Sequence, residues 1–274
     1  MERGTCRLCL KIADLQDSHY IPRRAYSMNM ARKLANPNPV VISHGKLKQV
    51  ADQLRGYTFC HDCEQMLSYK GEHWVLANIP EDQGKPFPLQ EALIPENPVF
   101  FGDEINVYAG RKIKAFDMDH LIYFGMSVFW RGAAREWKSS LGGTAPPVNL
   151  GEYNEPIRQF LLGGPFPDDV VILVYIHNLK PAMNAATTVL LAKNKMAEFH
   201  WIYLNGLGFE LYLGSEIPKQ IRQLCAHHSS DGFVMVDREF GKMVRNFLKD
   251  QLTSREWSAK FQDFLKGPDP RRTC

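Results

Sequence analysis

The chain has no apolar run that approaches the ~20 residues of a membrane-spanning helix. Its first residues also lack the charged-then-apolar pattern of a secretory signal peptide. The sequence shows no internal repeats and no low-complexity tract, and six cysteines in 274 residues do not make a disulfide scaffold. These absences argue against a membrane-spanning, repeat or disulfide-rich protein, and they predict a globular protein of the reducing cytoplasm.

The net charge of +3 is unevenly distributed along the chain. Residues 1–60 contain ten lysines and arginines against four acidic residues, so this segment carries +6 and the remainder carries −3. A basic segment attached to a mildly acidic body favours a polyanionic partner, with DNA as the first candidate. The alternative is that small zinc domains are often basic without binding nucleic acid.

Four of the six cysteines form two Cys-x-x-Cys pairs, Cys6 with Cys9 and Cys60 with Cys63. Each pair presents two thiolates from one tight turn, and two pairs complete the tetrahedral ligand set of a structural Zn²⁺. The alternatives are two unrelated reduced pairs or a redox motif. A redox Cys-x-x-Cys usually stands alone near a βαβ pattern, whereas this chain has two pairs and no such pattern. The spacing therefore predicts a zinc ion held by all four cysteines.

The chain is expected to fold as α+β, with a small unit at residues 1–77, a proline-rich connection at 78–98 and a larger unit at 99–274. In the first unit we expect a strand over 12–21, a helix over 23–34, a loose hairpin over 40–50 and a helix that begins at 64. The connection contains five prolines, which indicates a linker or crossing loop without a packed element.

In residues 99–274 we expect a hairpin around Gly110, a helix over 118–138 capped by Asp117 and a short helix over 155–162. Strands are predicted over 170–176, 187–192, 198–204 and 208–213, the last two joined by an Asn-Gly turn at Asn205. Helices are predicted over 239–252 and 254–265. Because the strands follow one another without long helices between them, this unit is predicted to be an antiparallel α+β domain.

The motif Ser18-His19-Tyr20-Ile21-Pro22 lies between the two cysteine pairs. With Cys6-x-x-Cys9 before it and Phe59-Cys60-x-x-Cys63-Glu64 after it, residues 6–75 resemble the HNH endonucleases whose ββα metal site is clamped by zinc. The segment is also similar to bacterial HNH-like proteins that carry a Ser-His-Ile-Ile-Pro motif. The resemblance implies a zinc-bound ββα domain of treble-clef type, hydrolysis of DNA phosphodiester bonds, and a setting in restriction or phage defence.

The resemblance also implies roles for individual residues. His19 would be the general base that activates the attacking water, and an imidazole pKa near ~6.5 suits that role. A catalytic divalent ion, Mg²⁺ or Mn²⁺, would be held by Glu64, with Asp17 as a second candidate ligand. The alternatives are a histidine that braces the zinc-binding turn and a glutamate favoured by the helix dipole in the first turn.

Two positions depart from the family pattern. Ser18 replaces the family's metal-binding aspartate, and Asp17, one residue earlier, is expected on the opposite face of the strand. Arg55 replaces the family's central asparagine; an arginine can contact phosphate but cannot orient the base through an amide carbonyl. The candidate nucleic-acid contacts are Arg23, Arg24 and Arg55, although the first two also suit a solvated helix start.

These departures favour a second hypothesis, a degenerate module that binds nucleic acid or a partner protein without catalysis. A third places an active site wholly within residues 99–274, and that unit is also a candidate surface for a protein partner or a second copy.

The other polar clusters give weaker signals. Asp117-Met118-Asp119-His120 is better explained as a helix cap, and Cys225-Ala226-His227-His228 has no second half of a metal site. His61 is not needed by a zinc with four cysteines, and Trp130, Arg131 and Trp137 are expected on the long helix as core and rim residues.

Overall fold

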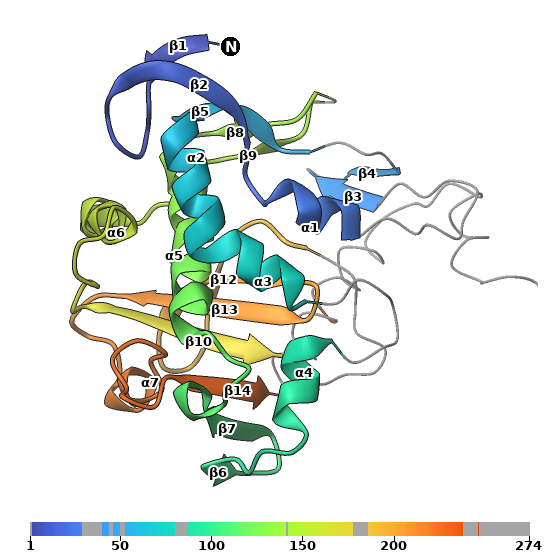
Figure 1. Cartoon of the computed structure of the whole chain (residues 1–274), viewed down its shortest axis with the longest axis vertical. Coiled ribbons are helices and arrows are strands. Elements are labelled where there is room, and N and C mark those ends of the chain that lie inside the picture. Colours follow the sequence, from blue (N-terminus) through green and yellow to red (C-terminus); the bar gives the residue numbers. More distant parts are fainter. Residues whose placement is uncertain are drawn as a thin grey trace, which may run out of the picture.

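The computed structural model describes residues 2–28, 40–43, 46–49, 53–79, 87–140, 142–177, 186–237 and 246. Within these residues the protein is a mixed α+β structure with a five-stranded sheet, a seven-stranded sheet and a separate two-stranded hairpin (Figure 1). The long helix α5 (Met118–Ala134) runs through the middle of the molecule. It packs on the larger sheet at β10 and on the helical segment that follows the second cysteine pair.

The five-stranded sheet is antiparallel, and both cysteine pairs lie at the ends of its strands. Its order is β1-β2-β5-β8-β9, with β1 (Glu2–Thr5), β2 (Ile12–His19), β5 (Arg55–Cys60), β8 (Trp137–Lys138) and β9 (Thr144–Ala145). The first cysteine pair lies in the connection from β1 to β2, and the second lies at the junction of β5 with α2 (His61–Leu67). Helix α2 packs on both β2 and β5, so two antiparallel strands and a helix form one local unit.

Helix α2 continues directly into the π-helix η1 (Ser68–Glu72) and into α3 (His73–Ala77), so this helical segment is longer than predicted. Gly71 lies where η1 crosses α5, and a Cβ at this position would stand 3.0 Å from the backbone of Phe124. The missing side chain therefore permits a close crossing of the two helices. At this crossing the next residue, Glu72, lies against α5.

The seven-stranded sheet has the order β11-β12-β13-β10-β14-β7-β6. Its strands are β6 (Phe100–Phe101), β7 (Ile105–Ala109), β10 (Val170–Ile176), β11 (Leu190–Lys193), β12 (Glu198–Leu204), β13 (Leu207–Leu213) and β14 (Phe233–Asp237). All seven residues of β10 are buried, as its continuous apolar sequence predicts. Asn205 and Gly206 have φ values of 46° and 91°, which is the conformation of the predicted Asn-Gly hairpin turn.

Four details of the later chain differ from the prediction. The sheet is not wholly antiparallel, because β10 and β14 run parallel. The expected hairpin around Gly110 is wrong, because β7 pairs with β6 and β14, and Gly110–Lys112 form a 3-10 turn. The long helix ends at Ala134, and Trp137 with Lys138 forms a strand that pairs with β5. The proline-rich connection contains α4 (Pro88–Leu93), which is packed through its buried leucines.

The remaining described elements either agree with the prediction in type or were not predicted. They are α1 (Arg23–Met28), the hairpin of β3 (Val40–Ser43) and β4 (Lys46–Gln49), η3 (Gly151–Tyr153), α6 (Asn154–Leu161) and α7 (Lys219–Gln223), of which η3 and α7 were not expected. Residues 29–34 of the first predicted helix, and both predicted C-terminal helices apart from residue 246, lie outside the described residues. No helix in the described part of the chain has the length and apolar character needed to cross a membrane.

One apolar core extends from the first sheet through α5 to the second sheet. Phe59 of β5, Phe129 of α5 and Ile172 of β10 all belong to it. Trp137 is fully buried and stacks on Tyr20, with ring centroids 5.6 Å apart. The five-stranded sheet thus includes two strands from beyond residue 99. The boundary between two domains at residues 78–98 stays a prediction of the sequence.

Candidate functional site

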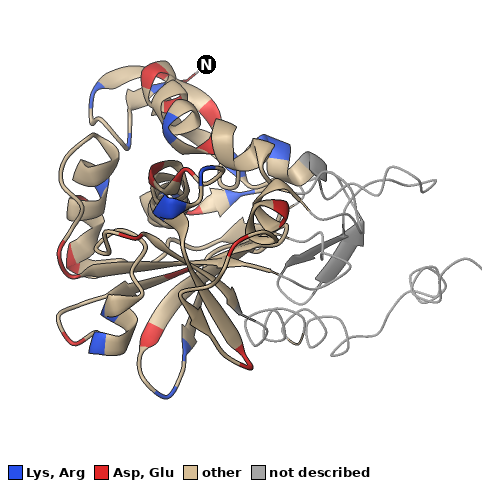
Figure 2. Ribbon diagram, turned by 60° about the horizontal axis from the view of Figure 1, so that its bottom comes forward, with Lys and Arg blue, Asp and Glu red and all other residues tan. Residues whose placement is uncertain are grey.

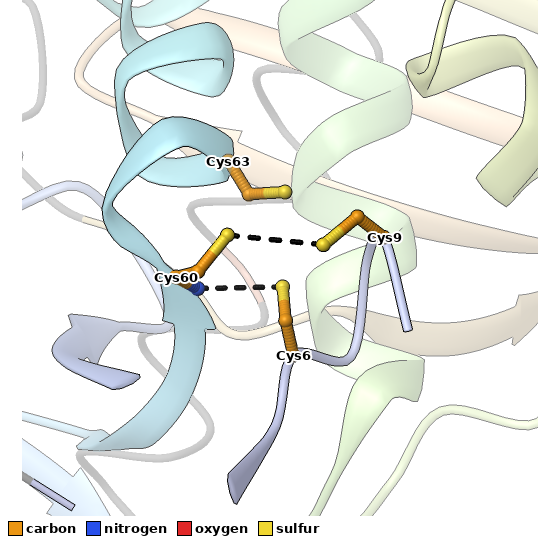
Figure 3. A group of neighbouring side chains, drawn as sticks. All are labelled: Cys6, Cys9, Cys60 and Cys63. Atoms are coloured by element: carbon orange, nitrogen blue, oxygen red, sulfur yellow. Dashed lines mark hydrogen bonds between the residues drawn. The ribbon is translucent and has the colours of Figure 1, made fainter. Parts of the chain in front are cut away.

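The four cysteine side chains converge from two turns, as Figure 3 shows. Their sulfur atoms all lie within 4.8 Å of one another, no disulfide joins them, and the Sγ atoms of Cys9 and Cys60 are 3.8 Å apart. Tetrahedral coordination with metal–sulfur bonds of ~2.3 Å places the sulfurs ~3.8 Å apart. The geometry and the donor set therefore fit a metal bound by Cys6, Cys9, Cys60 and Cys63.

Local hydrogen bonds shape the first cysteine turn. The N–H of Cys6 donates to the carbonyl of Lys11 at 2.9 Å, and the N–H of Leu10 donates to the carbonyl of Cys6 at 2.9 Å. Leu10 adopts a left-handed φ of 62°, which reverses the chain after the second cysteine of the pair. The N–H of Cys60 donates to the Sγ of Cys6 at 3.3 Å, so the two turns are also joined directly.

The surroundings favour a thiolate at Cys6. A hydrogen bond from the Cys63 thiol, with further bonds from backbone groups of the two turns, lowers the pKa of Cys6 to about 4 against the opposing effect of burial. A thiolate is the form of cysteine that binds metal. The same hydrogen bond raises the pKa of Cys63, and burial raises that of Cys60, so a bound cation would displace the protons of these thiols.

Arg158 of α6 brings a positive charge to the cysteine centre. Its side chain is largely buried, and its Nη1 donates to the carbonyl of Leu8 inside the first turn. Its other nitrogens pair with the carboxylate of Glu155 at 2.6 and 2.7 Å. Four thiolates around a divalent ion carry a net charge of −2, so a guanidinium at this position offsets part of that charge.

His19 ends strand β2 and lies opposite Arg55 of β5. It is partly buried, and burial lowers the pKa of its imidazole, while the negative charges of Asp17 and Glu64 act in the raising direction. Arg23 and Arg55 lower the same pKa through their positive charges. The structure therefore brings the predicted residues into one electrostatic neighbourhood, with the imidazole neutral near pH 7.

Asp17 and Arg55 form an ion pair with each other. The Nη1 of Arg55 donates to the Oδ2 of Asp17 at 2.9 Å, and both side chains are substantially exposed. Ser18 points the other way; its side chain is buried, and its Oγ accepts from the N–H of Phe59 at 3.3 Å. Asp17 thus lies on the side of the strand that carries His19, but its carboxylate is engaged by an arginine.

Glu64 lies in the first turn of α2, directly after Cys63. Its Oε2 is 4.0 Å from the Nη2 of Arg131, and its Oε1 is buried without a hydrogen-bond partner among the described residues. The same Nη2 of Arg131 donates to Glu72 of η1, and the Nη1 donates to the carbonyl of His19 at 3.4 Å. The sequence placed Arg131 among the core and rim residues. A charged residue in the otherwise uncharged stretch 121–134 was the signal that it has a partner of opposite charge.

Apart from the charge of Arg23 on His19, the other candidate residues do not join these groups. Arg23 and Arg24 are exposed at the start of α1, and Figure 2 shows basic and acidic residues interspersed along the described ribbon. Among the described residues, the four cysteines are the only group of three or more His, Cys, Asp or Glu side chains placed to share a metal ion. His61, Cys225, His227 and His228 belong to no such group there, and Asp17, His19 and Glu64 do not form a second one.

No protein-family model matches this chain, and the comparisons with curated proteins and with solved structures also give no match. The resemblance of residues 6–75 to HNH endonucleases therefore stays an expectation from the motif residues of the sequence.

Proposed function

We propose that this chain is a metal-dependent, HNH-like endonuclease that hydrolyses DNA and that its four cysteines hold a structural Zn²⁺. One observation carries the proposal. Strand β2, strand β5 and helix α2 pack together beside the two cysteine turns, and in this arrangement the charge of Glu64, whose Oε1 has no partner among the described residues, acts on the imidazole of His19.

The proposed zinc ion has a structural role. The two cysteine turns come from chain segments about fifty residues apart, and a shared ion fixes the end of β5 against the connection from β1 to β2. This junction also begins helix α2, which carries Glu64. Binding free energy at such a site is folding free energy, so the zinc would stabilise the scaffold that holds the proposed active site.

In the proposed mechanism, His19 accepts a proton from the water that attacks the phosphodiester phosphorus. Its burial-lowered pKa keeps the imidazole neutral and able to accept that proton. Glu64 would contribute an oxygen ligand to Mg²⁺ or Mn²⁺, and the ion would supply stabilisation of charge on the phosphate and on the leaving oxygen. The exposed Arg23 and Arg24 contact the phosphate backbone beside the cleavage point.

A second candidate function is a zinc module that binds nucleic acid or a protein partner without cleaving. The 2.9 Å ion pair between Asp17 and Arg55 favours it, because this pair engages the second candidate metal ligand and one candidate phosphate contact. The lack of a second three-ligand group among the described residues points in the same direction. Both candidates retain the zinc scaffold, so cleavage itself distinguishes them.

The test is incubation of zinc-loaded protein with supercoiled and linear DNA, with Mg²⁺, with Mn²⁺ and with EDTA. Wild-type protein is expected to nick or cut in the presence of a divalent ion, and His19→Ala is expected to be inactive while it stays folded and zinc-loaded. His61→Ala is the matched control, because His61 is an exposed histidine beside the same centre. DNA binding without cleavage under every metal condition would support the second candidate and reject the nuclease.

A further inference from the structure

Arg131 is a buried arginine that bonds to one proposed catalytic residue and faces the other, from a different part of the chain. Its side chain is 2% exposed, in a helix whose neighbouring residues pack in the core. Its Nη1 donates to the main-chain carbonyl of His19, and its Nη2 lies between Glu72 and Glu64. One guanidinium therefore donates to the strand end that carries the proposed base and lies 4.0 Å from the carboxylate proposed to hold the cation.

The surrounding packing fixes where this guanidinium lies. Gly71 lets η1 approach α5 closely enough for Glu72 to reach Arg131. On the other side, the indole Nε1 of Trp137 donates to the main-chain carbonyl of Arg131 at 2.8 Å. The face of the guanidinium lies over the ring of Phe59, with its Cζ 5.8 Å from the ring centroid. Contacts on several sides leave Arg131 little freedom to choose another position.

The neighbouring residue of α5 fixes the same strand end independently. A Cβ at Gly132 would stand 2.5 Å from the hydroxyl of Tyr20, so the tyrosine fits against α5 only because this residue is glycine. Tyr20 follows His19 directly, is 1% exposed, and accepts a hydrogen bond from the N–H of Val189 at 3.0 Å. Two consecutive residues of α5 therefore hold two consecutive residues at the end of β2.

The charges explain why an arginine suits this position. Burial of an arginine is costly unless its N–H groups are satisfied, and burial of an ionised carboxylate is costly unless it is paired. Both Nη atoms of Arg131 have hydrogen-bond partners, whereas its buried Nε has none among the described residues. Burial raises the pKa of Glu72, and the charge and hydrogen bond of Arg131 lower it. Arg131 thus pairs closely with Glu72 and lies 4.0 Å from Glu64, whose Oε1 keeps no partner among the described residues.

We infer that Arg131 is a positioning residue of the proposed active site. It fixes the position of His19 by donating to the main-chain carbonyl of that residue, and it fixes the position of the Glu64 side chain through the charge of the carboxylate. This inference rests on the proposed nuclease function for its catalytic consequence. It also means that the site is incomplete without α5, so residues 99–274 form part of the active-site structure. A misplacement of the reacting groups by about 1 Å can lower a rate by about 10²-fold, which sets the expected effect of losing Arg131.

The test uses the full-length, zinc-loaded chain labelled with ¹⁵N-histidine, in which the His19 ring signals are assigned with His19→Gln. The main variant is Arg131→Met with Glu72→Gln, which removes both charges of the closest pair together and does not leave Glu72 as an unpaired buried charge; Glu64, which is 25% exposed, loses its partner in this variant. Arg135→Met is the matched control, because Arg135 follows the same helix and donates to the carbonyl of Tyr57 without contacting His19 or Glu64.

The double variant is expected to keep its zinc and its melting temperature, to shift the His19 ring signals and to cleave plasmid about 10²-fold more slowly. Unchanged His19 signals together with an unchanged cleavage rate would overturn the inference and leave Arg131 as a counter-charge for Glu72. If the wild-type protein does not cleave DNA, the proposed function fails, and the His19 signals alone decide the positioning role.

Arg131→Lys covers the case of a double variant that does not fold. Lysine keeps the charge but replaces the planar fork with one nitrogen, so it cannot contact the His19 carbonyl and both carboxylates in the same way. Shifted His19 signals at full zinc content are expected in this variant. Unchanged signals would overturn the inference by themselves.

Discussion

The cysteine centre and the His19 neighbourhood lie on the same strands and helix, but they are organised differently. The four cysteines converge on one another with no competing partner of opposite charge inside the cluster. Around His19, in contrast, Asp17 is paired with Arg55, and Glu64 shares Arg131 with Glu72. The first region is a complete ligand set, whereas the second is a network of paired charges with one unpartnered carboxylate oxygen among the described residues. Structural binding can therefore be inferred from the first more directly than catalysis from the second.

The largest effect is expected at the cysteine centre. Cys60→Ser removes one of four ligands, and structural zinc sites contribute on the order of 10 kcal/mol of apparent binding free energy to folding. We expect loss of bound zinc, measured by metal analysis, and loss of the cooperative thermal transition. Cys225→Ala is the control, because Cys225 is buried outside the centre and should leave zinc content unchanged. A Cys60→Ser protein with full zinc content would break the four-cysteine assignment.

The next effect is expected at the arginine beside the cysteine centre. Arg158→Met removes the hydrogen bond to the carbonyl of Leu8 and a positive charge near the thiolates. Loss of an outer partner of a metal site typically weakens metal binding by about 10–100-fold. We expect correspondingly faster transfer of zinc to a chromogenic chelator. Arg222→Met, which removes a similarly anchored arginine on α7, should release zinc at the wild-type rate. Equal release rates for the two variants would show that Arg158 does not support the metal site.

A pH effect is expected from a histidine outside both regions, in strand β12 of the seven-stranded sheet. Burial lowers the pKa of His200 below its ordinary value of 6.5, although a hydrogen bond to the backbone of Asn149 and the charge of Glu198 raise it. The unfolded chain therefore takes up a proton at higher pH than the folded chain does. Stability should be constant above about 6.5 and should fall as the pH decreases from there toward the folded-state pKa.

His200→Gln should weaken this dependence, which thermal melts over a pH series would measure. His61→Gln is the control, because His61 is exposed. The comparison between the two variants also cancels any loss of zinc at low pH, since both keep the four cysteines. An identical pH dependence in wild type and His200→Gln would contradict this assignment.

The smallest effect is expected at the ion pair of Asp17 with Arg55. Both side chains are substantially exposed, and such pairs contribute about 0–1 kcal/mol to stability because solvent screens them. Asp17→Asn should therefore shift the denaturant midpoint very little. Its effect on metal-dependent cleavage sharpens the comparison: an unchanged Mn²⁺ requirement would show that Asp17 is a partner of Arg55 and not a metal ligand.

The features that could be predicted from the sequence are those fixed by nearby residues. The cysteine turns follow from a spacing of three, the cap from Asp117, whose side chain accepts the N–H of His120, and the β12–β13 turn from Asn205 and Gly206. Each depends on a few consecutive residues whose geometry or hydrogen bonding is local. The same holds for β10, whose apolar run predicts a buried strand.

The features that could not be predicted depend on contacts between distant segments. Trp137 leaves the helix because the chain there pairs with β5, some eighty residues earlier. The partners of Arg131 and Arg158 come from helix crossings and from the first cysteine turn, which no local pattern in either helix encodes. Strand β14, absent from the prediction, is fixed by its pairing with β7 and β10.

The central claim is that Glu64 and His19 form a metal-dependent active site. Its most direct test is the rate at which zinc-loaded protein nicks supercoiled plasmid as Mn²⁺ is increased, for wild type and for Glu64→Gln, which keeps the size of the side chain and removes its charge. The account predicts that nicking by the wild type rises and saturates with Mn²⁺, and that Glu64→Gln is inactive or requires much more Mn²⁺. Absence of nicking by the wild type, or the same Mn²⁺ dependence in both proteins, would contradict it.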